Sequence, residues 1–285
     1  MIRLAVRCGP AAAERVLAEL LHLAPGGVEE ESGPGWVEYA IYGAPGELPD
    51  LGSVEALSGD DSVRVSTEEI PDDWADRWRD FHEPTVIDGG RVVIRPSWER
   101  HPSADPGGAK PPPGIDVVVE PGRAFGTGAH PTTRMCVELL LELADAGEAA
   151  GTLVDLGTGS GVLALCAAKL GFGPVLAVDN EPAALEATRA NARANGVEVE
   201  AVRVNLREDE APLARTVVAN LTAPLLREVA ARLRSRPDLV PRSLVCSGLL
   251  AREGGEVSEA FTATGLAEAS RLSSGDWAAL RFASR

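Results

Sequence analysis

The sequence predicts an α/β protein: a doubly wound parallel sheet that ends in an antiparallel hairpin, preceded by a small α+β domain. Two observations support this prediction. From residue 152 onward, short apolar runs alternate with helical patterns, as in parallel strands joined by crossover helices. Residues 1–69 instead give the order βαββαβ, which suggests a ferredoxin-like sheet with its helices on one face.

The first 69 residues form a separate unit. We expect its strands at 2–8, 27–31, 36–42 and 62–70, and its helices at 11–23 and 48–57. Pro71 then suits the first turn of a linker helix at 70–83. In that helix Trp74 and Trp78 lie four residues apart and cover one face. The main domain follows from residue 84 to residue 285.

The most informative stretch runs from residue 152 to residue 180. It contains an apolar strand, three alternate glycines, a helix, a second strand and an acidic residue. Glycines let the backbone turn tightly and approach a ligand where a Cβ would collide. Such a βαβ unit places its ligand at the carboxyl ends of the strands. The elements are a strand at 152–156, then Gly157, Gly159 and Gly161, a helix at 162–170 closed by Gly171, and a strand at 174–178.

The glycine spacing helps to identify the cofactor. A dinucleotide site has the pattern G-x-G-x-x-G, whose third glycine would fall where this chain has Val162. Asp179 lies 22 residues beyond Gly157, where its carboxylate can accept hydrogen bonds from both ribose hydroxyls. The pattern D-x-G-x-G-x-G resembles that of the class I S-adenosylmethionine-dependent methyltransferases, whose sheet is Rossmann-like. A glycine turn in an unliganded α/β protein is the alternative.

The pattern continues to the C-terminus. A helix at 182–195 begins with proline and is followed by Gly196. Five parallel strands closed by an antiparallel hairpin are the usual methyltransferase sheet. The other expected elements are strands at 91–95, 115–120, 197–204, 216–220 and 243–247, helices at 134–143, 224–236 and 253–264, a hairpin of 266–272 and 277–282, and a Pro/Gly-rich surface loop at 101–114.

Composition argues against several classes of protein. No run approaches the ~18 apolar residues of a membrane helix, and we expect a cytoplasmic protein without a membrane partner. The four cysteines include no C-x-x-C pair, which argues against a zinc site or a disulfide framework. The net charge of −16 argues against nucleic acid as a direct partner but permits attraction of a basic protein.

A second motif, PGRAFGTGAHPTT, occupies residues 121–133. An aromatic residue stands among small ones, two glycines free the backbone around a threonine, and a histidine and two threonines lead into a helix start. Alone, the motif fits a Gly/Pro turn followed by a threonine N-cap. Its residues are Phe125, Gly126, Thr127, Gly128, His130, Thr132 and Thr133.

Five segments in one order indicate a family. They are DDWADRWRDFHEP, VVIRPSWE, EPGRAFGTGAHPTT, DLGTGSGVLALCAAKLG and VVANL. Together they resemble the bacterial ribosomal protein L11 methyltransferases, the PrmA family. The resemblance extends from residue 72 to the C-terminus by motif and over residues 1–69 by element order. The chain departs from the family pattern at three positions: an Asp, an apolar residue and a Cys that are common there are replaced by Glu120, Arg123 and Thr158. The resemblance therefore does not predict the shape of the substrate entrance.

This resemblance implies that the second domain binds S-adenosylmethionine and that the first domain captures ribosomal protein L11. The enzyme would methylate amino groups of that protein, either lysine side chains or the N-terminal amine, and we expect it to be a monomer. By position, Thr133, Gly157, Asp179 and Asn220 would contact the cofactor, and Phe125, Gly126, Thr127 and Gly159 would line the same site.

Asn220 is the candidate catalytic residue, because it ends the fourth strand beside the expected methyl position. Its side-chain carbonyl can orient an amine, while a strand-end turn is the alternative. The amine must be neutral, which at pH 7 costs about 4–5 kcal/mol for a lysine and about 1 kcal/mol for an α-amino group. His130 can accept a proton or make a structural hydrogen bond, and Asn205 can contact adenine or cap its strand; we assign no general base.

Other functions stay open. The segment VVANL lacks the N-P-P-Y motif of glutamine and adenine methyltransferases, which favours an amine acceptor. Lysine methyltransferases of other proteins, such as an electron-transfer flavoprotein subunit, share these motifs. A nicotinamide oxidoreductase and a cofactor-binding scaffold without catalysis are the alternatives from other classes.

Overall fold

The computed structural model describes residues 2–10, 12–13, 16–17, 20, 29–43, 63–69, 83–102, 114–120 and 128–284. The chain divides into two compact units, Met1–Phe81 and His82–Arg285. The predicted helix at 48–57 lies outside the described residues, as does nearly all of the predicted linker helix at 70–83. Within the described ranges, no helix has both the length and the apolar character needed to cross a membrane.

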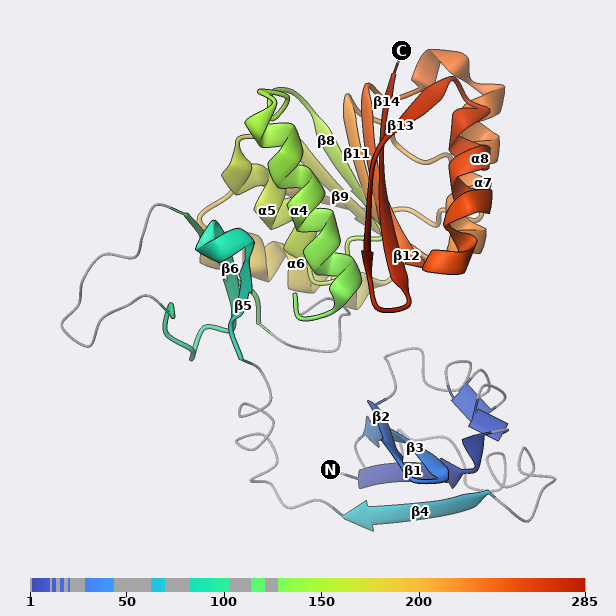
Figure 1. Ribbon diagram of the computed structural model, residues 1–285. Coiled ribbons are helices and arrows are strands. Elements are labelled where there is room, and N and C mark those ends of the chain that lie inside the picture. Colours follow the sequence, from blue (N-terminus) through green and yellow to red (C-terminus); the bar gives the residue numbers. More distant parts are fainter. Residues whose placement is uncertain are drawn as a thin grey trace. The chain divides into compact units, whose positions relative to one another are not determined.

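The first unit contains a four-stranded antiparallel sheet of order β2-β3-β1-β4 (Figure 1). Because β1 pairs with both β3 and β4, the order is that of a ferredoxin-like sheet, as predicted. The strand predicted at 27–31 lies two residues later, because the hairpin turns at Pro34 and Gly35. The strands are β1 (Ile2–Cys8), β2 (Glu29–Gly33), β3 (Trp36–Gly43) and β4 (Arg64–Glu69).

A helix covers one face of this sheet. Ala12, Val16 and Leu20 are helical and buried, and their spacing of four residues places them on one helix face. They form one apolar core with residues that alternate along two strands, which fixes the register of the sheet. The strand residues of that core are Leu4, Val6, Cys8, Tyr39 and Ile41.

The second unit is built on a seven-stranded sheet of order β10-β9-β8-β11-β12-β14-β13. The first five strands are parallel, and the last two form an antiparallel hairpin, which confirms the predicted sheet. The strands are β8 (Leu153–Leu156), β9 (Val175–Asp179), β10 (Glu200–Arg203), β11 (Thr216–Asn220), β12 (Ser243–Leu250), β13 (Leu266–Ser274) and β14 (Trp277–Ser284).

Helices cover both faces of this sheet (Figure 1). Successive residues of β8 point to opposite faces, so Leu153 joins the core beneath α4 and α5 while Val154 joins the core beneath α7 and α8. Both cores are apolar and fully buried, as expected of a doubly wound fold. The helices are α4 (Pro131–Asp145), α5 (Val162–Leu170) and α6 (Pro182–Asn195) on one face, and α7 (Ala223–Ser235) and α8 (Gly254–Thr262) on the other.

A smaller sheet lies against α4, α5 and α6. It has the order β5-β6-β7, with β5 antiparallel and β7 parallel to β6. Its buried residues Ile87, Ile94 and Val117 belong to the same apolar core as α4 and α5. The sequence did not predict β5, because a three-residue strand is too short to show an alternating pattern. The strands are β5 (Thr85–Ile87), β6 (Val92–Arg95) and β7 (Ile115–Val118).

Several predicted ends are wrong by a few residues. The strand predicted at 197–204 is limited to β10, four residues long. The strand predicted at 243–247 continues to Leu250, because a register shift between Cys246 and Leu249 accommodates Gly248, whose φ is +83°. Helix α4 begins at Pro131 rather than at residue 134. The earlier start of α4 places the predicted site residue Thr133 inside the helix rather than before it.

Candidate cofactor and acceptor site

The glycine loop connects β8 to α5 at the carboxyl end of the sheet. Gly157, Gly159 and Gly161 have φ values of +73°, +55° and +86°, which side chains other than glycine rarely adopt. A Cβ on Gly157 would lie 2.4 Å from Leu221 Cδ2, and one on Gly161 would lie 3.0 Å from the Thr188 side chain. The positive φ values therefore favour glycine at all three positions, as the sequence predicted, and the nearby Thr188 also leaves little room for a Cβ at Gly161.

Asp179 ends β9, the neighbour of β8, so its carboxylate faces the glycine loop. Its Oδ2 accepts a hydrogen bond from the Gly159 N–H at 2.9 Å, and its Oδ1 accepts one from the Glu181 N–H at 3.1 Å. A carboxylate offers about four lone-pair positions, so both oxygens can accept further hydrogen bonds. The structure thus brings together Asp179, which was predicted to contact the cofactor, and Gly159, which was predicted to line the same site.

Asn220 ends β11, on the other side of β8, and lies against the start of α4. Its Nδ2 donates to Thr132 Oγ1 at 3.2 Å and to Thr133 Oγ1 at 3.4 Å. Both threonines are buried. Because the carboxyl ends of β8, β9 and β11 are adjacent, the glycine loop, Asp179 and Asn220 share one edge of the sheet.

His130 caps α4 and continues this chain of hydrogen bonds. Its Nδ1 accepts from the Thr132 N–H at 3.3 Å and lies 2.7 Å from Thr132 Oγ1. Since Nδ1 accepts from the amide, it carries no proton, and the Thr132 hydroxyl donates to it. The ring lies edge-on to Trp277, with ring centroids 4.9 Å apart, and burial lowers the pKa of His130. The N-cap is therefore histidine rather than threonine, and this geometry favours the structural alternative for His130.

Asp155 lies in β8 beneath the glycine loop; it begins the D-x-G-x-G-x-G pattern, but the sequence analysis assigned it no role of its own. It is fully buried, and its Oδ2 accepts from Thr158 Oγ1 at 2.7 Å and from the Ala164 N–H at 3.2 Å. Its Oδ1 has no partner among the described residues. Burial raises the pKa of Asp155 to about 7, and the charge of Asp179 adds to this effect. An acidic residue inside an otherwise apolar strand was the sequence signal for this position.

The remaining candidate residues have different outcomes. Phe125, Gly126 and Thr127 lie outside the described residues, so their predicted contacts stay predictions. Asn205 follows β10, and its Oδ1 accepts from the Arg207 N–H at 3.1 Å. This hydrogen bond caps a turn, which favours the capping alternative over an adenine contact. Three residues of α6 (Thr188, Asn191 and Asn195) bond to this region and were missed, because polar residues on a helix are usually exposed.

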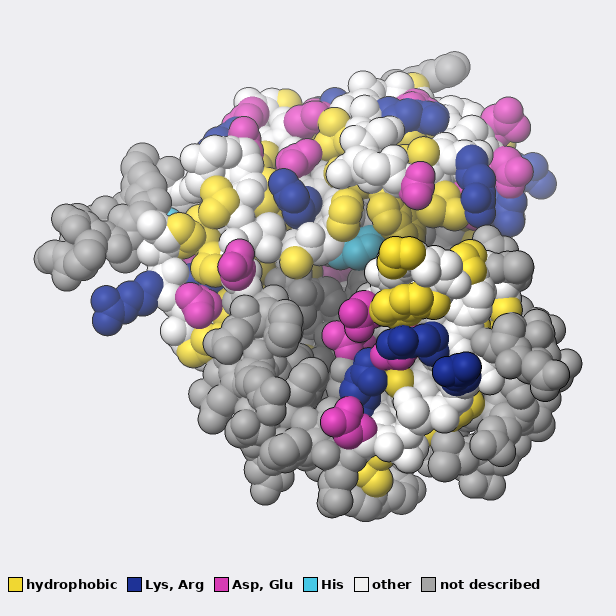
Figure 2. Space-filling model, turned by 60° about the horizontal axis from the view of Figure 1, so that its bottom comes forward, with side chains coloured by type: hydrophobic (Ala, Val, Ile, Leu, Met, Phe, Trp, Pro, Cys, Tyr) yellow, Lys and Arg dark blue, Asp and Glu magenta, His cyan; other side chains and the backbone are white. Residues whose placement is uncertain are grey.

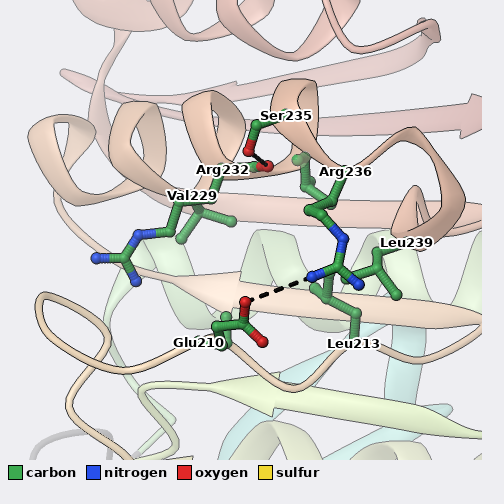
Figure 3. Close-up of a pocket in the computed structure, with 9 residues that line it drawn as sticks. Glu210, Leu213, Val229, Arg232, Ser235, Arg236 and Leu239 are labelled. Atoms are coloured by element: carbon green, nitrogen blue, oxygen red, sulfur yellow. Dashed lines mark hydrogen bonds and ion pairs between the residues drawn. The ribbon is translucent and has the colours of Figure 1, made fainter.

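A separate cavity of about 110 Å³ lies between α7 and the segment that precedes β11 (Figure 3). Its apolar lining includes Leu213 and Leu239, and Arg236 reaches across it to Glu210. This cavity is at the amino end of β11, whereas Asn220 is at the carboxyl end. The cavity is therefore distinct from the candidate site.

Charged side chains of both signs are interspersed on the face shown in Figure 2, despite the net charge of −16. Exposed ion pairs of the protein include Arg91 with Asp145 and Arg227 with Glu256. Such a surface suits a folded protein in water and does not by itself indicate a partner.

The sequence of this chain is similar to those of one protein family. The family model for "Ribosomal protein L11 methyltransferase (PrmA)" matches residues 51–285. A protein of that name from Pelotomaculum thermopropionicum is 41% identical over 224 residues, which are 77% of this chain and 67% of the relative. One from Geobacter metallireducens is 39% identical over 214 residues, 74% of this chain and 66% of the relative. The matches thus span about two thirds of the length of these curated relatives.

A solved structure of a protein with the same described activity is also similar to this chain. The crystal structure of a ribosomal protein L11 methylase from Lactobacillus delbrueckii subsp. bulgaricus aligns with a TM-score of 0.58 and 26% identity. The alignment covers 70% of this chain and 98% of that chain. Together with the family model, which covers most of the sequence, these similarities show that the chain belongs to the ribosomal protein L11 methyltransferase (PrmA) family.

Proposed function

We propose that this chain is an S-adenosylmethionine-dependent methyltransferase that modifies amino groups of ribosomal protein L11. The observation that supports the proposal most is the position of Asn220 beside the glycine loop and the start of α4. Family membership supports the same reaction and the same protein substrate. The family uses S-adenosylmethionine, which would supply a methyl group on a sulfonium centre.

The residues at the sheet edge fit this cofactor. Three glycines with positive φ form the loop, so no Cβ at those positions can hold a ligand away from the backbone. The Asp179 carboxylate retains lone pairs for the two ribose hydroxyls, and each charge-assisted hydrogen bond would contribute about 1.5–3 kcal/mol. In this proposal Gly159 and Thr133 line the same site, and Phe125, Gly126 and Thr127 belong to it by position.

Asn220 would orient the acceptor amine. Both hydrogens of its Nδ2 point to threonine hydroxyls, which fixes the plane of the amide and the direction of its Oδ1. A fixed carbonyl oxygen can accept an N–H from a neutral amine and aim the nitrogen lone pair at the methyl group. The main contribution of the protein is then positioning, which turns a bimolecular reaction into an effectively unimolecular one.

The first unit would capture the protein substrate. Its ferredoxin-like sheet carries none of the residues assigned to the cofactor, and it is a compact unit of its own. We further propose domain limits of 1–69, 70–83 and 84–285, a cytoplasmic location, action as a monomer, and no direct nucleic-acid or membrane partner.

Transfer of label tests the proposal. Purified ribosomal protein L11 is incubated with the chain and methyl-labelled S-adenosylmethionine, and modified peptides are identified by mass spectrometry. We expect label on lysine side chains or on the N-terminal amine. The same assay on a whole lysate includes other lysine-containing proteins, such as an electron-transfer flavoprotein subunit. Label confined to one of those would replace L11 as the substrate, and absence of both labelling and cofactor binding would overturn the proposal.

A further inference from the structure

One face of α6 carries polar side chains that are buried. Thr188 and Asn191 are 0% and 1% exposed, although asparagine is a poor helix former and a buried amide needs hydrogen-bond partners. Asn195 follows one turn later. The spacing of three to four residues places all three on the same face. Their role is therefore to form hydrogen bonds with the backbone that α6 covers.

Asn191 bonds to two segments that are far apart in the sequence. Its Oδ1 accepts from the Glu120 N–H at 3.1 Å, and its Nδ2 donates to the Ser160 carbonyl at 2.8 Å. Ser160 lies inside the glycine loop, and Glu120 immediately precedes the motif at 121–133. The side chain thus connects the glycine loop to the backbone that follows β7.

The neighbours of Asn191 each reach one of these segments. Thr188 Oγ1 donates to the Gly159 carbonyl at 3.1 Å, on the side of the loop. Asn195 accepts from the Val118 N–H at 2.8 Å and donates to the Val118 carbonyl at 2.6 Å, on the side of β7. Four residues of a helix rise about 6.0 Å and two residues of a strand about 6.6 Å, so Asn191 and Asn195 match the spacing of Glu120 and Val118. Of the three side chains, Asn191 bonds to both segments.

We propose that Asn191 is a positioning residue that fixes the glycine loop relative to the backbone that follows β7 at Glu120, and that cofactor affinity depends on it. The inference rests on the proposed function, because it takes this edge of the sheet as the S-adenosylmethionine site. A ligand bound by the glycine loop gains affinity when the loop is held in place in advance, since less conformational freedom is lost on binding. Asn191 acts on the cofactor through Ser160 and Glu120.

Two substitutions on the same helix test this inference. Asn191→Ala removes both bonds, and Asn195→Ala is the matched control because it removes an amide that bonds to β7 but not to the glycine loop. Binding of S-adenosylhomocysteine is measured by calorimetry on the full chain, and kcat and KM are measured in the methylation assay. We expect Asn191→Ala to raise Kd and the cofactor KM at least tenfold, with kcat at saturating cofactor within threefold of the wild type. We expect Asn195→Ala to leave Kd within threefold, although it lowers the melting temperature.

Hydrogen exchange on the unmodified protein gives a second measurement that does not depend on folding of a variant. S-adenosylhomocysteine is expected to slow exchange of the Glu120 amide, which donates to Asn191, together with the amides of the glycine loop. Protection of the loop without protection of Glu120 would overturn the inference, as would an unchanged Kd in Asn191→Ala or an equal rise in Kd in Asn195→Ala. If the wild type does not bind S-adenosylhomocysteine, the proposed function itself fails and the inference with it.

Discussion

The side-chain amide of Asn220 donates to the hydroxyl of Thr132 at 3.2 Å, although 88 residues separate them in the sequence. This contact joins the carboxyl end of β11 to the first turn of α4. It also determines which side of the Asn220 amide is available, because the nitrogen faces the threonines. The carbonyl oxygen is then the atom that can meet an acceptor amine.

Replacing Asn220 with alanine is expected to lower kcat about 100-fold, because a misplaced acceptor alone can cost that much. Binding of S-adenosylhomocysteine should change less, since the glycine loop and Asp179 are intact. Calorimetry and initial rates on the same protein separate these effects. Asn205→Ala is the matched control, because that strand-end asparagine caps a turn. A variant Asn220→Ala with the wild-type kcat would rule out its role in orienting the amine.

Thr132 is expected to matter through its hydroxyl. Thr132→Val removes the group that accepts from Asn220 and donates to His130, whereas Thr132→Ser keeps it. We predict a roughly tenfold lower kcat for the valine variant, because it loses one hydrogen bond worth about 1.4 kcal/mol in the transition state. The serine variant should have near wild-type activity. Equal activity of the two variants would show that the hydroxyl does not orient Asn220.

Asp179→Ala is expected to lower cofactor affinity at least tenfold, because a ribose would lose a charged acceptor. The substitution also frees the Gly159 amide, which Asp179 holds at 2.9 Å. Calorimetry with S-adenosylhomocysteine measures the change. Asp238→Ala serves as control, since that carboxylate forms a surface pair with Arg236. Unchanged affinity in Asp179→Ala would contradict the ribose assignment.

Asp155 predicts a pH dependence of stability. Burial raises its pKa from 3.8 to about 7, so between these values the folded state holds a proton that the unfolded state does not. The resulting stabilisation is complete below about pH 4 and is lost as pH rises through 7, with an upper limit of roughly 4 kcal/mol. Urea denaturation at pH 5 and pH 8 gives the free energy of unfolding at each pH. The difference between the two values should be smaller in Asp155→Asn than in the wild type. Asp145→Asn, at an exposed carboxylate paired with Arg91, should keep the wild-type difference.

Removing residues 1–69 is expected to retain cofactor binding and to abolish methylation of ribosomal protein L11. The residues assigned to the cofactor all belong to the unit His82–Arg285, which has its own two apolar cores. Calorimetry and the labelling assay measure the two properties. Full-rate methylation by the truncated chain would contradict the capture of substrate by the first unit.

Much of the fold was predictable because its signals are local. The glycine loop follows a short apolar strand, Asp179 and Asn220 each end one, and parallel strands bring such residues to one edge. The contacts between Asn220 and Thr132, and between Asn191 and Ser160, were not predictable, because they join residues far apart in sequence. Asn191 further looks like an exposed helical residue by composition, and Asp155 looks like part of the glycine motif until its burial is known.

The two asparagines of α6 also affect whether the smaller sheet can pair with a second molecule. Strand β7 lies at the edge of its sheet, and an edge strand with unpaired amides and carbonyls can pair with another chain and start aggregation. Asn195 occupies both backbone groups of Val118, and Asn191 occupies the amide of Glu120. With these groups engaged, this part of the edge is not available for pairing with a strand of a second molecule.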